Sequence, residues 1–287
     1  MPPSHPRLWI VATPLGEVSD LSLRARDILA TADCILAEDT RRAQRLFTAC
    51  GLPKRPMLSF FEHNEQEREA EVLARLKAGE DVALISDAGT PLLSDPGYHL
   101  VRACRRQGIA VSPVPGPSAP VCALSAAGLP PLPYSFLGFL PRDTAGKRRL
   151  FTAFARTPGT LIFFERGDRL AESLKQALAI LGERELAVCR ELTKDHEEFI
   201  LLPLEFWDRL PTPLLGELTV LIGPPAEKLR TPKDEVLSEL AAREHGCRAR
   251  DLIRELQRVV SGWSSKELYA LLRERKEAAE SQLSAKD

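Results

Sequence analysis

Residues 82–91 read Val-Ala-Leu-Ile-Ser-Asp-Ala-Gly-Thr-Pro, and this stretch decides the class of fold. Val82–Ser86 is a short, continuous apolar run, which is typical of a strand buried on both faces of a parallel sheet. A polar loop follows at once, with Asp87 at the strand end and Gly89 two residues later. Glycine has no Cβ, so backbone can approach a ligand closely at that position. The stretch therefore predicts a buried strand that ends in a ligand-binding loop.

The same pattern recurs along the chain and predicts an α/β fold with mostly parallel strands. Apolar runs of strand length occur at Leu8–Ala12, Cys34–Ala37, Val82–Ser86, Ala110–Val114, Thr160–Phe164, Glu185–Cys189 and Leu218–Ile222. Helical periodicity lies between several of them. Polar or glycine-containing loops follow four of the predicted strands, at Val11–Gly16, Ala37–Arg42, Ser86–Pro91 and Val114–Ala119. Ligands of such sheets usually bind beyond the carboxyl ends of the strands, so we expect these loops to form one site.

Composition excludes several classes of protein. The chain has 287 residues, of which 44 % are hydrophobic and 28 % charged, as in folded soluble domains. No apolar run is long enough for a membrane span, and the N-terminus lacks the pattern of a signal peptide. The six cysteines are widely spaced, which favours neither disulfides nor a thiolate metal site and makes the cytoplasm the simplest compartment. Because the net charge is −1, nucleic-acid binding would need local basic patches.

Proline-rich and glycine-rich segments suggest where the chain divides. Pro113–Pro117 is a stiff turn after which the patterning restarts, and Gly223–Pro225 interrupts the last strand. Residues after Thr231 have helical patterning only, and Thr231 with Pro232 is a favourable helix start. We therefore predict an N-terminal α/β domain with a mostly parallel sheet at 1–117, a second α/β domain at 118–225 and a small helical tail module at 226–287.

A series of motifs in fixed order resembles a known family. The strings are LWIVATPLG, AEDTR, HNE, ISDAGTPLLSDPGYHLV, VPGPSA, LSAAGLP, GFLP, RELTK and GELTVLIG, between residues 8 and 223. Together they resemble the ribosomal RNA small-subunit methyltransferase I family, bacterial members of the tetrapyrrole methylase superfamily. Two departures are visible: Glu17 stands where the family usually has Asn, and the run Glu165–Arg169 lacks the family's Ser.

The resemblance implies an activity, a cofactor and an assembly. The enzyme would use S-adenosylmethionine (SAM) to methylate the ribose 2′-hydroxyl of a cytidine in the decoding region of small-subunit (16S) rRNA. The subunits would have two α/β domains with SAM in the cleft between them, and would form a homodimer without metal. Two alternatives stay open: C-methylation of a tetrapyrrole such as a cobalamin precursor, and a SAM-binding or RNA-binding scaffold without turnover.

The motifs also assign candidate residues. Those expected to contact SAM are Pro14, Gly16, Asp87, Ala88, Gly89, Thr90, Ser118, Ala119, Gly216 and Glu217. Those expected to position the substrate or remove its proton are Glu38, Asp39, Glu165, Glu191 and Lys194. For Glu38–Arg41 the alternative is an ordinary helix cap, and for Glu191 with Lys194 it is a surface ion pair. Sequence alone selects no single general base, because a base is defined by its distance from the proton.

Basic segments predict where RNA would bind. Lys147, Arg148 and Arg149 follow the flexible Gly146 after the GFLP motif, and Arg41 lies in a second cluster with Arg42 and Arg45. A solvated surface is the alternative for each cluster. The tail between Arg243 and Lys276 carries nine Arg or Lys and five Asp or Glu. Its two predicted helices, joined by a turn at Ser261–Ser265, form either a helix-turn-helix that binds nucleic acid or a bundle that only packs.

Overall fold

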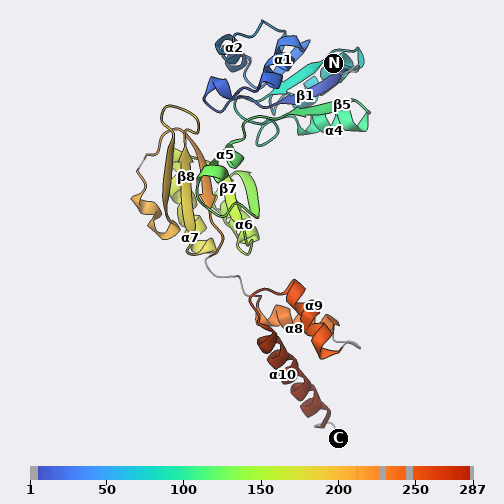
Figure 1. The fold of residues 1–287 in the computed structure, drawn as a ribbon, viewed down its shortest axis with the longest axis vertical. Coiled ribbons are helices and arrows are strands. Elements are labelled where there is room, and N and C mark those ends of the chain that lie inside the picture. Colours follow the sequence, from blue (N-terminus) through green and yellow to red (C-terminus); the bar gives the residue numbers. More distant parts are fainter. Residues whose placement is uncertain (1–5, 212, 226–230, 244–247, 285–287) are drawn as a thin grey trace. The chain divides into compact units, whose positions relative to one another are not determined.

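The computed structural model describes residues 6–211, 213–225, 231–243 and 248–284, and the chain forms two compact units. The first unit runs to Pro224 without Arg156–Pro158, and the second takes those three residues and the chain from Pro225 onward (Figure 1). Within the described residues, no helix combines the length and apolar character needed to cross a membrane.

The N-terminal sheet of the first unit is parallel throughout, as predicted. Its order is β3-β2-β4-β1-β5. The strands are β1 (Arg7–Val11), β2 (Cys34–Ala37), β3 (Met57–Ser59), β4 (Val82–Ile85) and β5 (Ala110–Val114). The helices that cover it are α1 (Leu23–Thr31), α2 (Thr40–Ala49), α3 (Glu65–Lys77) and α4 (Tyr98–Arg106), with a 3-10 turn η1 at Val18–Asp20. Leu29 of α1 and Phe47 of α2 pack on one face, while Leu76 of α3 and Leu100 of α4 pack on the other.

The second sheet of this unit is mixed. Its order is β6-β7-β10-β8-β9, and only β6 and β7 run parallel. The strands are β6 (Tyr134–Phe139), β7 (Thr160–Arg166), β8 (Glu185–Arg190), β9 (Glu198–Pro203) and β10 (Glu217–Ile222). One face packs against α6 (Thr144–Phe154), α7 (Gly167–Leu181) and the 3-10 segment η2 (Leu204–Arg209), and the other face packs against α5 (Ala119–Ala126).

All seven predicted strands are present, and three further strands were missed. β3, β6 and β9 each lie at the edge of a sheet, and their side chains are mostly half-buried or exposed. β3 has only three residues and β6 is interrupted by Ser135 and Gly138, so neither carries a long apolar run. β9 does contain the apolar run Phe199–Leu202, which the sequence analysis did not select. The mostly parallel sheet was predicted for the N-terminal domain, where it is confirmed. The second sheet is mostly antiparallel: no helix intervenes between β8 and β9, and an antiparallel connection results.

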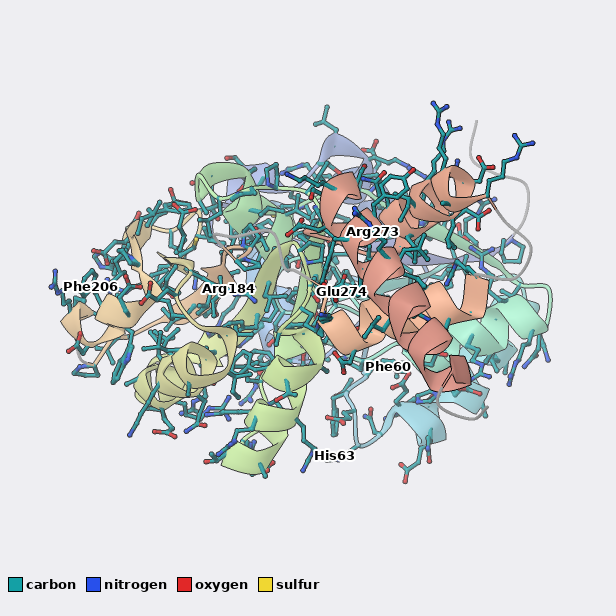
Figure 2. All side chains as sticks on the ribbon, turned by 90° about the horizontal axis from the view of Figure 1, so that it is seen from below. Phe60, His63, Arg184, Phe206, Arg273 and Glu274 are labelled. Carbon is teal, nitrogen blue, oxygen red and sulfur yellow. The ribbon has the colours of Figure 1, made fainter. Side chains whose placement is uncertain are left out.

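A buried arginine closes one end of the second sheet. Arg184, labelled in Figure 2, is 4 % exposed. Its guanidinium donates hydrogen bonds to the carbonyl oxygens of Leu181, Gly223 and Ala155 at 3.2, 3.3 and 2.6 Å. These carbonyls lie at the ends of α7, β10 and α6. One cation therefore satisfies three backbone acceptors that would otherwise be buried without partners.

The described cysteines are reduced, and most of them are fully buried. Cys34 and Cys104 lie in the core of the first sheet, and Cys189 lies in the second. Burial raises the pKa of the Cys104 thiol to about 11 and that of Cys189 to about 12. These thiols serve as small apolar core groups.

The second unit is helical, as predicted, and has a core of its own. Its helices are α8 (Lys233–Arg243), α9 (Ala249–Val259) and α10 (Ser265–Ser284). Val236 of α8, Leu256 of α9 and Leu268 of α10 are fully buried together. Thr231 fixes the turn between α9 and α10, because the Trp263 indole donates to its carbonyl at 2.7 Å and the Ser261 N–H donates to its hydroxyl at 2.8 Å.

We predict that the first unit folds without the second. No hydrophobic cluster mixes residues before 223 with residues after 231 among the described side chains. A chain ending at Pro224 should remain soluble, and its thermal unfolding midpoint should match that of the first unit in the full chain. Circular dichroism on both chains tests this, and an insoluble or markedly less stable truncation would contradict it.

Candidate functional site

The strand-end loops of the first sheet are joined by hydrogen bonds. Thr13 and Gly89 form an isolated β-bridge, with N···O distances of 2.9 and 3.1 Å, and the Thr13 hydroxyl also donates to the Ser86 carbonyl at 3.2 Å. The Thr90 hydroxyl donates to the carbonyl of Pro117 at 2.8 Å. β4, β1 and β5 are neighbours in the sheet, so their loops meet at its carboxyl edge as predicted. The result is a fixed rim of three loops.

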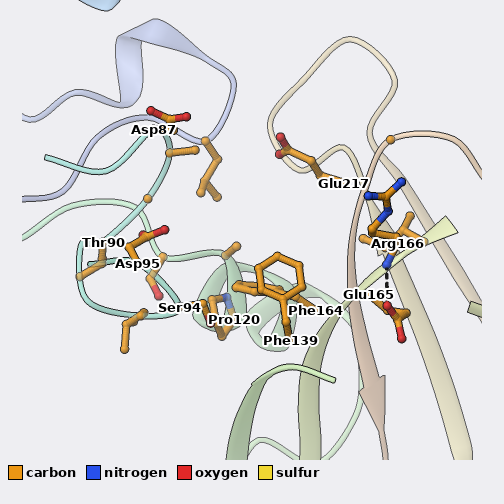
Figure 3. Close-up of a pocket in the computed structure, with 18 of the residues that line it drawn as sticks. Asp87, Thr90, Ser94, Asp95, Pro120, Phe139, Phe164, Glu165, Arg166 and Glu217 are labelled. Carbon is orange, nitrogen blue, oxygen red and sulfur yellow. Dashed lines mark hydrogen bonds between the residues drawn. The ribbon is translucent and has the colours of Figure 1, made fainter. Parts of the chain in front are cut away.

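A cavity of about 360 Å³ opens between this rim and the second sheet (Figure 3). Asp87, Ala88, Gly89, Thr90, Ser118 and Ala119 line it from the first sheet's loops, and Gly216 with Glu217 lines it from the second sheet. The structure thus brings together eight of the ten residues predicted to bind the cofactor. Gly16 lines an adjoining cavity instead, and Pro14 is buried and lines neither.

Gly89 is required at the rim by its backbone conformation. Its φ is +79°, in the left-handed region that side chains with a Cβ rarely adopt. A Cβ at this position would lie 3.1 Å from Cδ2 of Leu15, which also lines the cavity. A larger residue would therefore both strain the backbone and narrow the cavity.

Asp87 is held by two partners. One carboxylate oxygen accepts the backbone N–H of Asp39 at 3.3 Å, and the other pairs with the Arg42 guanidinium at 3.1 Å. These contacts connect the end of β4 with the start of α2. Asp39 itself caps α2 by accepting the N–H of Arg41 at 2.8 Å. Asp39 therefore has the role of an ordinary helix cap, which was the alternative interpretation of Glu38–Arg41. Glu38 is exposed and does not line the cavity.

Asp95 is a cavity residue that sequence analysis did not select. Leu92 and Ser94 precede it with φ of +73° and +75°, conformations that cost about 1–3 kcal/mol each and concentrate at functional sites. Burial, with a smaller contribution from the charge of Glu38, raises the pKa of the Asp95 carboxyl from 3.8 to about 7. Its position in the quoted SDPG string was the only available signal, because proximity to Ser86, Glu38 and Asp87 depends on tertiary structure.

Glu165 lines the cavity, and its side chain is anchored in the core. Its side chain is fully buried, and its oxygens accept from Arg169 Nε at 2.8 Å and from the Ser173 hydroxyl at 2.5 Å. Lys147 Nζ lies 3.9 Å from the same carboxylate. Ser173 supplies a hydroxyl partner although the family's Ser is absent from the Glu165–Arg169 run. With its oxygens engaged in this way, Glu165 is poorly placed to accept a substrate proton.

The expectation of a flexible, exposed loop at Gly146–Arg149 is wrong. These residues belong to α6, whose N-terminus is capped by Asp143 accepting the Gly146 N–H at 2.7 Å. Lys147 is only 3 % exposed because it reaches into the core toward Glu165, so its ammonium cannot meet an RNA phosphate in this conformation. Arg148 and Arg149 are exposed on the helix surface.

Lys194 borders the adjoining cavity and is paired with carboxylates. Its ammonium lies 3.2 Å from Glu191 and 3.0 Å from Glu217. The cavity that it lines shares Leu15 and Arg42 with the first one and includes Gly16 and Arg45. A Cβ on Gly16 would lie 2.3 Å from Cγ of Lys194, so this glycine permits close approach of the two loops.

Glu17, a departure from the family pattern, and Arg41, which was predicted to bind RNA, both make local contacts. Glu17, which replaces the family's usual Asn, caps η1 by accepting the Ser19 N–H at 2.9 Å. Arg41 is 87 % exposed, pairs with Asp39 at 3.3 Å and lines neither cavity. Among the described residues, no group of three or more His, Cys, Asp or Glu side chains is arranged to hold a metal ion.

Comparisons with known proteins identify relatives. The family model of the tetrapyrrole (corrin/porphyrin) methylases matches residues 7–206. The ribosomal RNA small subunit methyltransferase I of Micromonospora olivasterospora is 40 % identical over 272 residues, covering 93 % of this chain and 86 % of that protein. The protein of the same name from Mesorhizobium japonicum is 44 % identical over 247 residues, covering 84 % and 83 %. The uroporphyrin-III C-methyl transferase of Thermus thermophilus, in complex with S-adenyl homocysteine, shares the fold with a TM-score of 0.53 and 20 % identity over 76 % of this chain and 97 % of that one.

We predict that Asp95 makes the stability of the protein depend on pH. A carboxyl whose pKa is raised on folding costs stability as pH rises from its unfolded pKa, near 3.8, through its folded pKa of about 7. Asp95→Asn mimics the protonated form and removes this loss. The difference between the thermal unfolding midpoints of Asp95→Asn and wild type should therefore be more in favour of the variant at about pH 8 than at about pH 5. Asp208→Asn, at an exposed carboxyl of η2, is the control. An equal difference from wild type at both pH values for Asp95→Asn would contradict the prediction.

Proposed function

We propose a specific reaction for this chain, which belongs to the tetrapyrrole methylases and, within them, to the ribosomal RNA small subunit methyltransferase I family. The reaction is SAM-dependent methylation of the ribose 2′-hydroxyl of a cytidine in small-subunit (16S) rRNA. The observation that carries the proposal is the cavity in which the family's loops converge from two sheets. The tetrapyrrole alternative is supported only by distant structural likeness, which concerns the fold.

The first cavity suits SAM by its size, its carboxylates and its aromatic surface. Its volume of about 360 Å³ lies in the range of small-molecule sites. Asp87 and Glu217 contribute carboxylates that complement a cofactor with a positive sulfonium and a positive ammonium group, while Phe139 and Phe164 contribute aromatic surface. When bound, SAM supplies an electrophilic methyl group. The residues that would hold it are Asp87, Ala88, Gly89, Thr90, Ser118, Ala119, Gly216 and Glu217.

The chain must orient the ribose hydroxyl and assist the loss of its proton. Orientation by fixed loops can supply several kcal/mol of the rate enhancement. Asp95 is the best candidate to accept the proton, because it lines the cavity and a pKa of about 7 keeps the carboxyl partly ionised at neutral pH. Of the residues expected from sequence, Lys194 keeps a positioning role through its contact with Glu217. Glu38 and Asp39 would then shape the loop beside Asp87.

RNA would approach along exposed cations near the cavities. Arg42 and Arg45 lie on successive turns of α2 and line the adjoining cavity. Arg148 and Arg149 on α6, and Arg41 at the start of α2, offer further phosphate contacts. The assembly we propose is a homodimer in the cytoplasm. Exposed apolar side chains of the second sheet's region, including Val121, Leu132 and Leu201, are candidates for its interface.

We predict that the protein adds one methyl group to cytidine in small-subunit rRNA. Small subunits from cells that lack the protein should gain 2′-O-methylcytidine when incubated with SAM and the full chain, as measured by mass spectrometry of rRNA nucleosides. Omission of SAM is the control. Methylation of the base, or methylation of a tetrapyrrole with no change in rRNA, would contradict the proposed reaction. Stoichiometric SAM binding without any product would favour the scaffold alternative.

We also predict that Gly89→Val weakens SAM binding. The valine side chain would be strained at φ of +79° and would crowd Leu15 at the cavity wall. Gly108→Val is a matched control, since Gly108 has φ of +71° but a Cβ added there would have no atom within 4 Å, and it does not line the cavity. Calorimetry should give at least roughly tenfold weaker SAM binding for Gly89→Val alone, which corresponds to about 1.4 kcal/mol. Equal affinity of both variants would remove Gly89 from the site.

A further inference from the structure

The helical second unit carries a basic groove between α9 and α10. Three arginines line it from α9 and its N-cap, namely Arg248, Arg250 and Arg254, together with one carboxylate, Asp251. Ser265 and Tyr269, one helical turn apart on α10, line the opposite side. The charged side chains of the groove therefore carry a net positive charge at neutral pH.

The arginines face solvent because α9 is strongly amphipathic. Leu252, Ile253 and Leu256 are buried in the core of the unit, which leaves Arg250 and Arg254, four residues apart, on the exposed side. No carboxylate pairs with Arg248, Arg250 or Arg254 in the part of the chain that the structure describes. Unpaired guanidinium groups keep all their N–H donors available for an anionic ligand, and their planar fork matches phosphate geometry.

The groove is also shaped by contacts between its walls. The Gln257 amide donates to the Ser265 hydroxyl at 2.9 Å and joins α9 to α10 at one end. The N-terminus of α9, at Ala249, lies beside Arg248, and helix N-termini favour anions through their free N–H groups. Tyr269 is 37 % exposed, so part of its ring is open to stacking. Cations, a helix N-terminus and an aromatic ring are the elements that bind a nucleic-acid strand.

We propose that this groove binds the phosphate backbone of the rRNA substrate, with Tyr269 stacking on an unpaired base. The proposal rests on the proposed function for its choice of RNA. Phosphate contacts supply affinity without reading sequence, and the deep major groove of RNA helices excludes side chains. The groove therefore recruits the substrate, while the cavity of the first unit selects the reacting nucleotide. Of the two interpretations of the tail that the sequence left open, the proposal adopts nucleic-acid binding.

The test compares charge reversals inside and outside the groove in the full chain. Arg250→Glu with Arg254→Glu should weaken binding of an rRNA fragment at least about tenfold and lower the salt dependence of binding, because phosphate contacts are lost. Tyr269→Ala should weaken binding several-fold with an unchanged salt dependence. SAM affinity and turnover at saturating RNA should stay at wild-type values in both.

Arg273→Glu is the matched control for charge. Arg273 is exposed on α10 (Figure 2) and does not line the groove. RNA affinity equal to wild type in this variant supports the proposal, whereas equal weakening by Arg254→Glu and Arg273→Glu singly would assign the effect to overall charge and overturn it. Wild-type RNA binding by the double variant, with an unchanged unfolding midpoint, would also overturn it. Duplex DNA is a second probe. If the double variant lost binding of duplex DNA and kept wild-type binding of the rRNA fragment, the groove would be a DNA site and the proposal would be overturned. Failure of the proposed function is distinct, since the wild-type chain would then leave rRNA unmethylated.

Discussion

The pairing of Thr13 with Gly89 is the constraint on which the candidate site depends. Two backbone hydrogen bonds join the ends of β1 and β4 beyond the sheet, and Thr90 extends the connection to the loop after β5. The left-handed conformation of Gly89 makes this pairing possible at the place where the chain turns. With three loops joined, Asp87 and Asp95 acquire defined positions around one cavity. Because the loops are already ordered, binding does not have to supply the entropy cost of ordering them, and its free energy can serve to orient the substrate.

The opposite wall depends on buried charge. Phe164, Glu165 and Arg166 of β7 all line the cavity. The side chain of Glu165 is buried, and those of its two neighbours point to the opposite face of the strand, since successive side chains alternate. Anchoring Glu165 in the core through Arg169, Ser173 and Lys147 therefore fixes the outward orientation of its two neighbours. An ion pair at the surface would contribute little, but these groups lie where solvent screens them weakly. Backbone hydrogen bonds thus hold the loop wall of the cavity, and a buried network of charged and polar side chains holds the β7 wall.

The central strands, the helical tail and eight of the ten residues expected at the cofactor cavity could be predicted from sequence. Buried parallel strands are continuous apolar runs, and loops at their carboxyl ends must converge, so Asp87–Thr90 and Ser118–Ala119 were identifiable. The edge strand β6 is interrupted by Ser135 and Gly138 and carries no such pattern, whereas the apolar run Phe199–Leu202 of β9 was present in the sequence and not selected. Lys147 looked like a surface cation because sequence does not reveal the buried Glu165 that it faces. Asp95 was missed for the related reason that its raised pKa comes from burial and from Glu38, which is distant along the chain.

Burial of the cysteines determines how susceptible each thiol is to oxidation. Peroxides and disulfides react with thiolates, and a thiol with a pKa of about 11 or 12, as in Cys104 and Cys189, is almost entirely protonated in the cell. Both side chains are also closed off from solvent. Of the cysteines described, Cys122 in α5 is the one with partial exposure, and α5 begins beside the cavity residues Ser118 and Ala119. Among the described cysteines, oxidation should therefore begin at that helix, next to the cofactor loops, while the buried thiols react more slowly.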